Sequence, residues 1–363
     1  MIARYAAPVR TLFILVAMLG CKKAHEDPPK PAAPLPPVAG VTPNEADFTI
    51  PGFHFADGSQ LDLRIHYTTL GTPHGNNAVL IMHGTTGSGR QFLQKQFADV
   101  LFGKGQPLDV TKYFVILPDD IGHGGSSKPS DGMRTKFPHY GYEDMVTAEH
   151  ALVTDGLKVD HLRLVMGTSM GCMHSWMWAE KWPQMMDAVM PLACLPIAIA
   201  GRNREWRKML IDSIQHDPAY ANGDYKDQPR HGLETAAHIF AIAGSSPIAD
   251  QKRLATPDAA DAAVADLEQK FAASHDANDV VYQVASSRDY DPSAKLEAIT
   301  APVMYVNSAD DFINPPELAI AEREIQRVKK GKFVLIPASA ETHGHGTHTW
   351  AALWQQYLVE LLQ

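Results

Sequence analysis

The sequence predicts an α/β protein, a mostly parallel sheet flanked by helices and extended by a helical insertion. Short apolar runs typical of buried parallel strands recur along the chain. Amphipathic helical patterns, such as 142–157 and 316–330, fall between several of them, as βαβ units require. Over residues 196–294 only helical periodicity is found. The apolar runs are residues 78–83, 113–118, 162–167, 188–193, 303–308 and 333–338.

An antiparallel hairpin is expected ahead of the parallel strands. The segment from Asp47 alternates in polarity on both sides of the turn Ala56-Asp57-Gly58. We therefore assign residues 45–195 and 295–363 to the α/β core and residues 196–294 to a helical cap over one face of it. A chain of 363 residues is long enough for such a domain with one large insertion.

The first 21 residues have the pattern of a signal peptide. Arg4 and Arg10 precede an apolar stretch over 11–19, which is shorter than the roughly 20 residues that span a bilayer. Gly20-Cys21 follows and resembles a bacterial lipobox, in which the cysteine is lipidated. Cleavage by the ordinary signal peptidase and an uncleaved anchor are the alternatives.

Residues 22–44 are rich in proline and poor in large apolar side chains, a composition typical of an extended tether. With the signal, the tether predicts an exported protein, periplasmic or held at a bacterial membrane as a lipoprotein. The membrane is then contacted only through that anchor.

Charge and cysteine content narrow the partners and the chemistry. The net charge of −9 argues against a nucleic-acid partner, which would need a basic face. Besides Cys21, only Cys172 and Cys194 are present, too few for a disulfide framework. Their spacing does not say whether they pair, and we expect two buried free thiols.

A candidate nucleophile lies in Gly167-Thr168-Ser169-Met170-Gly171. This G-x-S-x-G motif directly follows the apolar run 162–167 and precedes a helical pattern. Two glycines permit the sharp strand-to-helix turn that exposes the serine in α/β hydrolases. The alternative, a glycine-rich turn with an incidental serine, does not explain the strand–turn–helix setting.

Two backbone N–H groups are predicted to form an oxyanion hole. The helix that begins after Ser169 offers the N–H of Met170, and His83-Gly84-Thr85 closes an earlier strand and offers the N–H of Thr85. A plain tight turn is the other explanation for the His-Gly pair.

A general base and its charge partner are expected after the last two strands. Asp311 follows the run 303–308 and has a proline four residues later, as in the acid turn of this fold; Asp310 is the runner-up, and the unused acid is expected to be solvated. Gly344-His345 follows the final run, which makes His345 the base. His343 and His348 are expected at the pocket wall or surface. No metal or cofactor is predicted, because no Asp, Glu or Cys spacing supports a metal.

The chain resembles the homoserine O-acetyltransferase-like α/β hydrolases over most of residues 65–350. The resemblance implies a serine acyl-enzyme mechanism and assigns the catalytic roles to Ser169, Asp311 and His345. It rests on NAVLIMHGTTG (77–87), GKGQPLDVTKYFVI (103–116), FPHYGYEDMVTAEHALVTDGLKVDHLRLVMGTSMGCM (137–173) and DPAYANGDY (217–225).

Two positions and one loop depart from the acetyltransferases of that family. Gly346 replaces the acid that meets the substrate amine, and Ile211 stands where a substrate-binding arginine is usual, although Arg207 lies one turn earlier. Residues 119–132 are similar to the D-x-x-G-H-G-x-S loop of ordinary esterases. A zwitterionic amino acid would therefore lack its two charged partners, and acetyl-CoA is not present outside the cytoplasm.

These observations favour an exported serine hydrolase that cleaves small-molecule carboxylic esters. O-acyl transfer, as in the related transferases, is the second hypothesis. A non-catalytic envelope lipoprotein that keeps the fold for binding is the third, and the complete set of catalytic residues argues against it.

Overall fold

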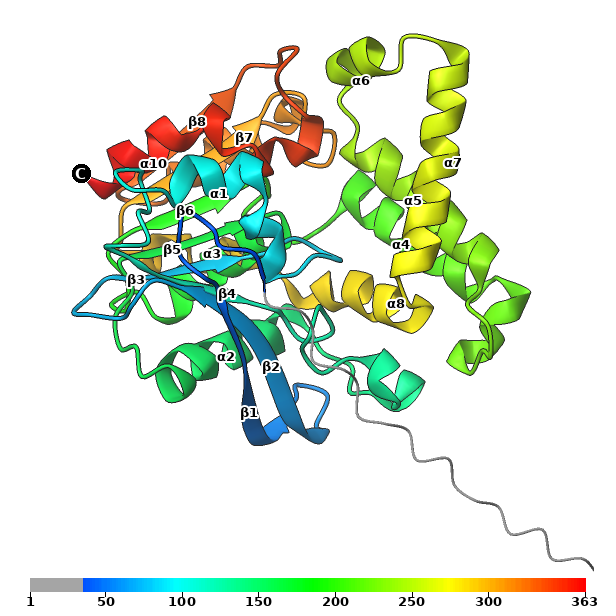
Figure 1. Cartoon of the computed structure of the whole chain (residues 1–363), viewed down its shortest axis with the longest axis horizontal. Coiled ribbons are helices and arrows are strands. Elements are labelled where there is room, and N and C mark those ends of the chain that lie inside the picture. Colours follow the sequence, from blue (N-terminus) through cyan, green and yellow to red (C-terminus); the bar gives the residue numbers. More distant parts are fainter. Residues whose placement is uncertain (1–34) are drawn as a thin grey trace, which may run out of the picture. The chain divides into compact units, whose positions relative to one another are not determined.

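A computed structural model describes residues 35–363, and in this part of the chain eight strands form one sheet (Figure 1). Their order across the sheet is β1-β2-β4-β3-β5-β6-β7-β8; β1 and β2 pair antiparallel, β2 meets β4 antiparallel, and all other pairs are parallel. The strands are β1 (Asn44–His54), β2 (Gln60–Leu70), β3 (Ala78–Met82), β4 (Phe114–Pro118), β5 (Leu164–Thr168), β6 (Val189–Leu192), β7 (Val303–Ser308) and β8 (Gly331–Ile336).

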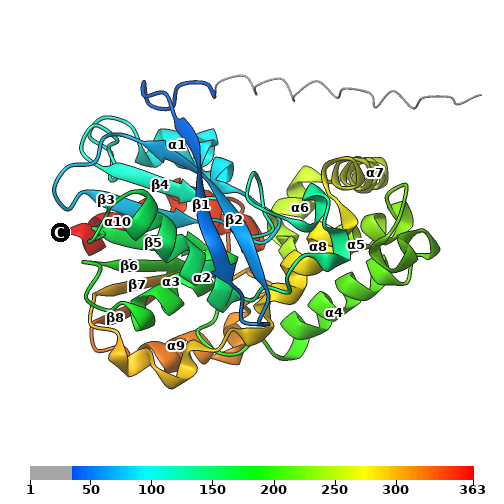
Figure 2. The same cartoon turned by 90° about the horizontal axis from the view of Figure 1, so that it is seen from below.

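Helices cover both faces of this sheet, so β3 to β7 are buried along their whole length (Figure 2). One apolar cluster joins one face to α2, α3 and α9, and a second joins the other face to α1 and α10. Burial on both sides explains the continuous apolar runs in the sequence. These helices are α1 (Lys95–Leu101), α2 (Tyr142–Ala151), α3 (Met170–Lys181), α9 (Ile320–Ile325) and α10 (Gln355–Leu362).

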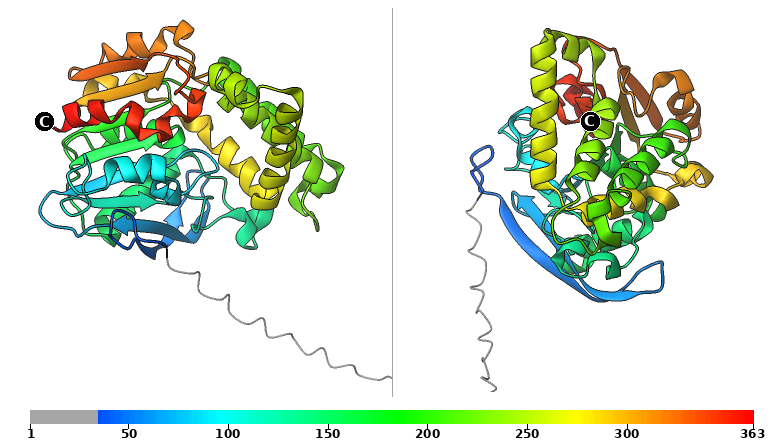
Figure 3. Two further views of the ribbon diagram at one scale, coloured as in Figure 1. Left: turned by 45° about the horizontal axis from the view of Figure 1, so that its top comes forward. Right: turned by 90° about the vertical axis from the view of Figure 1, so that its right-hand side faces the viewer.

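Between β6 and β7 the structure contains helices and no strand, and we call α4 to α8 the cap (Figure 3). The cap has an apolar cluster of its own, centred on Leu210, Leu233 and Val280. It is tied to the core where Asp279 accepts hydrogen bonds from Ser130. The cap helices are α4 (Gly201–Gln215), α5 (Arg230–Gly244), α6 (Pro247–Arg253), α7 (Pro257–Ser274) and α8 (Ala277–Ala285).

The predicted signal peptide, Cys21 and most of the predicted tether lie outside the described residues. The end of the tether does not match the prediction, because Val38 is 7% exposed and packs in the cluster around α1 and α10. Val38 and Val41 also form a backbone bridge, and β1 begins at Asn44. The last residues of the proline-rich segment thus belong to the fold, since these valines supply apolar contact that the prolines do not.

The expectation of two free thiols is wrong: Cys172 on α3 and Cys194 after β6 form a disulfide. The residues are 22 apart in the sequence, and their Cα atoms lie 5.8 Å apart, within the range that a disulfide spans. Sequence spacing could not reveal this distance, which depends on how α3 packs beside β6. The bond joins the helix behind Ser169 to the segment that leads into the cap.

None of the helices in residues 35–363 is both long and apolar enough to cross a membrane.

We expect the double variant Cys172→Ala/Cys194→Ala to lower the free energy of unfolding by about 2–4 kcal/mol, because the bond restricts the unfolded chain. Denaturant titration with and without reductant measures this difference, with reduced wild type as the control. Two titratable thiols in the native protein purified without reductant would contradict the pairing.

Candidate active site

Ser169 lies in the turn between β5 and α3 with φ 56° and ψ −107°, a conformation that L-residues rarely adopt. The flanking glycines allow this turn because there is no room for a side chain. A Cβ atom at Gly167 would lie 2.0 Å from the carbonyl oxygen of Gly171, and one at Gly171 would lie 2.1 Å from that of Met82. The helix therefore packs directly on β3 and β5, and the serine projects from the end of the sheet.

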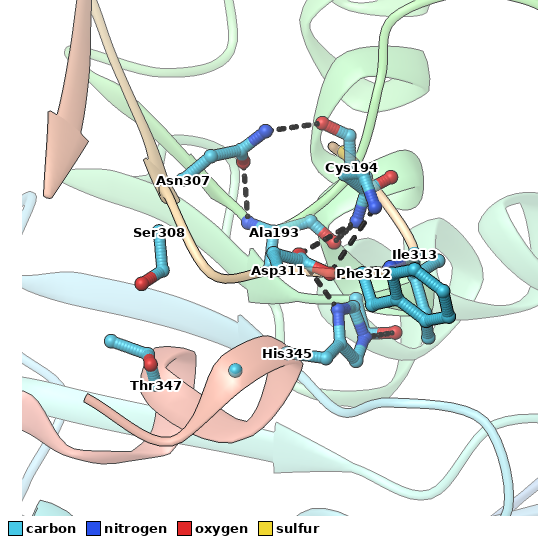
Figure 4. A network of polar contacts seen from close by, with 12 residues as sticks. Ala193, Cys194, Asn307, Ser308, Asp311, Phe312, Ile313, His345 and Thr347 are labelled. Carbon is cyan, nitrogen blue, oxygen red and sulfur yellow. Dashed lines mark hydrogen bonds and ion pairs between the residues drawn. The ribbon is translucent and has the colours of Figure 1, made fainter. Parts of the chain in front are cut away.

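The structure brings Ser169, His345 and Asp311 together in the predicted order. His345 Nε2 lies 2.8 Å from Ser169 Oγ. His345 Nδ1 lies 2.9 Å from Asp311 Oδ2, as Figure 4 shows. Burial alone raises the pKa of Asp311, but His345 and the hydrogen bonds from Asn314 outweigh burial and hold that pKa below its ordinary value. The carboxylate is thus charged at neutral pH and can orient the imidazole.

Sequence reasoning missed Asn314, which fixes Asp311 in place. The Asn314 side chain donates to Asp311 Oδ2 at 2.9 Å and to the carbonyl oxygen of Ala193 at 3.0 Å. Asn307 holds the same strand end, because its amide accepts the Ala193 N–H at 3.1 Å and donates to the Cys194 carbonyl at 3.3 Å. Asn307 lies in β7 and Asn314 in the loop that follows it, but nothing in the sequence shows that both face the end of β6.

Asp310 is not the solvated loop residue that we expected. It is half-buried and accepts hydrogen bonds from Ser246 of the cap, Thr342 and the backbone N–H of Gly344, at 2.8, 2.8 and 3.0 Å. The loop after β8 folds back over the loop after β7, and this brings the donors to Asp310. Asp311 thus orients the imidazole, while Asp310 anchors the segment in which His345 lies.

The predicted oxyanion donors lie beside Ser169. The N–H of Gly171 donates to the carbonyl of His83 at 2.8 Å, which places the loop after β3 against the start of α3. The His83 ring fixes the next peptide, since Nδ1 donates to Gly84 O at 2.8 Å and Nε2 accepts the Asp120 N–H at 3.1 Å. Within residues 35–363 the N–H of Thr85 has no hydrogen-bond partner, so it is free to meet a negative oxygen.

A family model described as "alpha/beta hydrolase fold" matches residues 77–342. The chain belongs to this α/β-hydrolase family. The match covers both candidate oxyanion residues, Ser169, Asp311 and the whole cap; His345 follows three residues after its end.

Individual relatives place this α/β hydrolase close to the homoserine O-acetyltransferase-like branch. It is 33% identical over 213 residues to a homoserine O-acetyltransferase of Moorella thermoacetica, covering 52% of this chain and 55% of that protein. A second, from Citrifermentans bemidjiense, is 29% identical over 319 residues, covering 77% and 86%. An ethyl acetate hydrolase of Pseudomonas veronii is 31% identical over 184 residues, covering 47% and 49%. The chain thus spans about half the length of the first and third of these relatives.

A solved structure confirms the fold. An acetylester hydrolase from Corynebacterium glutamicum superposes with a TM-score of 0.78 at 21% identity, covering 89% of this chain and 96% of that one. The relatives named here are homoserine O-acetyltransferases and ester hydrolases, and this chain shares their α/β-hydrolase fold.

A cavity of about 220 Å³ lies over Ser169, between the core and the cap. Its cap side includes Trp206, Phe240 and Arg207. Ile211, at the family's arginine position, packs instead with the apolar cluster of the cap. The cation that lines the cavity is Arg207, one helical turn before Ile211. On α3, Met173 lines the cavity, whereas Trp176 is fully buried in the core.

The two remaining histidines near His345 have the predicted locations. His348 lines the cavity, and burial together with the nearby His345 lowers the pKa of His348 to about 3, so this ring is neutral at working pH. His343 stacks on Trp350, with ring centroids 4.0 Å apart.

Beneath the loop after β3, which carries Thr85, lies a buried cluster of polar side chains that the sequence did not reveal. Asp120, Glu149 and His174 each offer one donor atom within 4.8 Å of the others, the one set in residues 35–363 with the composition of a metal site. His174 Nδ1 lies 2.9 Å from Glu149 Oε1 and 3.7 Å from Asp120 Oδ2, and Trp178 Nε1 donates to Glu149. These residues come from three separate elements, so no local spacing marks them.

The two carboxyl groups of this cluster hold a proton more tightly than isolated carboxyl groups would, whereas His174 holds one less tightly. Burial raises the pKa of Glu149 to about 7, and burial together with the charge of Glu149 raises the pKa of Asp120 well above its usual range. Burial lowers the pKa of His174. In an interior shielded from water, ionising both carboxyl groups costs more free energy than ionising one, which favours a state in which one of them keeps its proton.

We expect Glu149→Gln to remove a pH dependence of stability. Folded Glu149 binds a proton that the unfolded chain releases near pH 4.5, so the free energy of unfolding falls as pH rises from about 4.5 through the folded pKa of about 7, by about 1–3 kcal/mol, and levels off above it. Urea unfolding between pH 5 and 8 measures the slope.

The matched control is Glu143→Gln, an exposed carboxyl on the same helix. An unchanged slope in Glu149→Gln would show that the proton resides elsewhere.

Proposed function

We propose that this protein is an exported serine esterase that hydrolyses small carboxylic esters through an acyl-Ser169 intermediate. The observation that carries the proposal is the continuous hydrogen-bonded chain Ser169–His345–Asp311, with contacts of 2.8 and 2.9 Å. It opens into a cavity that also exposes the Thr85 loop.

In the first half of the reaction, Ser169 Oγ attacks the ester carbon while His345 Nε2 takes its proton. The carbonyl electron pair moves to oxygen, where the N–H groups of Thr85 and Met170 stabilise the charge; one such donor contributes about 10²–10³ in rate. The C–O bond to the alcohol then breaks, and His345 returns the proton to the departing oxygen. Asp311 stabilises the transient imidazolium.

In the second half, water gives a proton to His345 and attacks the acyl carbon. The bond to Ser169 Oγ breaks, the carboxylic acid is released, and Oγ regains its proton. Water is the acceptor that we favour, because Gly346 replaces the acid that would meet a substrate amine and the loop 119–132 has the esterase pattern. The ethyl acetate hydrolase among the relatives supports this choice.

Acyl transfer to a hydroxyl group is the second candidate, and Arg207 is the observation that favours it. A guanidinium in the cavity with Ser169 is suited to bind a carboxylate, such as that of an amino-acid acceptor. The homoserine O-acetyltransferases among the relatives fit this alternative.

We expect wild type to release free acid from p-nitrophenyl and alkyl acetates and Ser169→Ala to lose at least about 10⁴-fold in kcat. Asp311→Asn is expected to lose about 10⁴-fold, because the imidazole adopts the wrong tautomer, and its neighbour variant Asp310→Asn far less. Product analysis by chromatography, with and without homoserine, measures the partition. Acyl homoserine as the main product at low acceptor concentration would replace hydrolysis with transfer.

We further propose export through residues 1–21, with Cys21 as the lipidated N-terminus. The charged and apolar pattern of that segment supports export. The Cys172–Cys194 disulfide supports it independently, since such bonds persist mainly in oxidising compartments.

In a bacterial host, wild type is expected in the membrane fraction and labelled by a palmitate analogue, whereas Cys21→Ser is expected to lose the label. Fractionation and gel fluorescence measure both. An unlabelled wild-type chain recovered from the periplasm would indicate cleavage by the ordinary signal peptidase instead.

A further inference from the structure

A second, larger cavity of about 900 Å³ adjoins the one over Ser169. It lies between the segment after β6, residues 195–203, and the loop after β7, residues 309–320. The two cavities share four lining residues, so they adjoin each other; we call the larger one the side groove. The shared residues are Met173, Asn203, Ile313 and Asn314.

The lining of the side groove is mainly apolar. Leu195, Ile197 and Ile199 contribute from one side, and Phe312 and Leu318 from the other. Phe312 and Leu318 are 40% and 51% exposed. Large apolar side chains left in solvent beside a catalytic cavity indicate a surface that a ligand covers.

The charged groups of the side groove are paired or stand at its rim. The Arg202 guanidinium lies 3.8 Å from the centroid of the Phe312 ring and donates to the Phe312 carbonyl at 2.6 Å. Asp310 is engaged by its hydrogen-bond donors, Asp311 is buried against His345, and Glu317 is exposed. Arg202 thus holds Phe312 in place, and the groove offers little to a charged ligand.

A polar cavity of about 410 Å³ lies on another side of the catalytic cavity, sharing Thr86 and Gln91 with it. Arg90, Lys128 and Asp276 line this cavity. An apolar chain leaving Ser169 toward these charges would strip them of water without replacing their hydrogen bonds. The side groove is therefore the direction in which an apolar chain can leave Ser169 with the smallest desolvation cost.

We propose that the side groove binds a long, uncharged apolar chain of the ester whose carbonyl sits at Ser169. The proposal rests on the esterase function proposed above and extends it, because it names the substrate class as esters with a medium or long hydrocarbon chain. That chain can belong to the acyl group or to the alcohol, and the two are separated by the test.

Two substrate series test the proposal with the full-length wild-type protein. One lengthens the acyl group, from p-nitrophenyl acetate to p-nitrophenyl octanoate, and the other lengthens the alcohol, from ethyl acetate to octyl acetate. In one series kcat/KM should rise about twofold per CH₂, or about sixtyfold over six, because a half-open groove buries each methylene only in part. The series in which kcat/KM rises shows whether the long chain belongs to the acyl group or to the alcohol.

Leu318→Asp should lower the long-to-short ratio of kcat/KM at least about fivefold, since a carboxylate in the groove must be desolvated by the chain. Val264→Asp is the matched control: Val264 is 47% exposed on α7 and does not line the groove, and the ratio should not change. Circular dichroism and thermal unfolding check that both variants fold.

A direct readout separates failure of the groove from failure of the esterase function. The rate at which methyl and octyl fluorophosphonates label Ser169, followed by intact mass, depends on the nucleophile but not on turnover. Faster octyl labelling that Leu318→Asp abolishes supports the groove. Labelling and hydrolysis without any chain-length preference overturn the groove and leave the esterase intact, whereas no labelling and no hydrolysis overturn both.

Discussion

The direct packing of α3 against β3 and β5 is the constraint on which the rest of the site depends. It is possible only because residues 167 and 171 lack side chains, and it is fastened by the hydrogen bond from the Gly171 N–H to the His83 carbonyl. This contact holds Ser169 at a positive φ and keeps the Thr85 loop beside it. Nucleophile and oxyanion donors are therefore fixed by one backbone contact, so the site needs little reorganisation when charge develops.

The other half of the site depends on two adjacent aspartates that have different roles. Asp311 points inward and is saturated by His345, Asn314 and backbone donors, while Asp310 points to the cap and to the loop after β8. A change in the cap near Ser246 would thus reach the segment that holds His345. The catalytic imidazole is oriented by a carboxylate and held by a second one in a separate network.

Below the catalytic residues lies a buried polar cluster, and beside them lies an apolar groove. The Asp120–Glu149–His174 group sits in the core below the loop after β3, where the backbone N–H of Asp120 contacts the ring of His83. The side groove opens between the loop after β7 and the segment that leads into the cap. A buried polar interior and an open apolar border match the two parts of the proposed substrate, an ester carbonyl and a hydrocarbon chain.

The sequence by itself determined the sheet, the helical insertion and the identity of Ser169, Asp311 and His345. Apolar runs bounded by turns report burial directly, and the glycines around Ser169 report a backbone geometry that is local. Only the tertiary structure decided the Cys172–Cys194 pair, the anchoring role of Asp310, the place of Arg207 in the cavity and the buried group around Glu149. Each of these depends on side chains from separate elements meeting in space, and the distance between such elements is set by packing that no local pattern records.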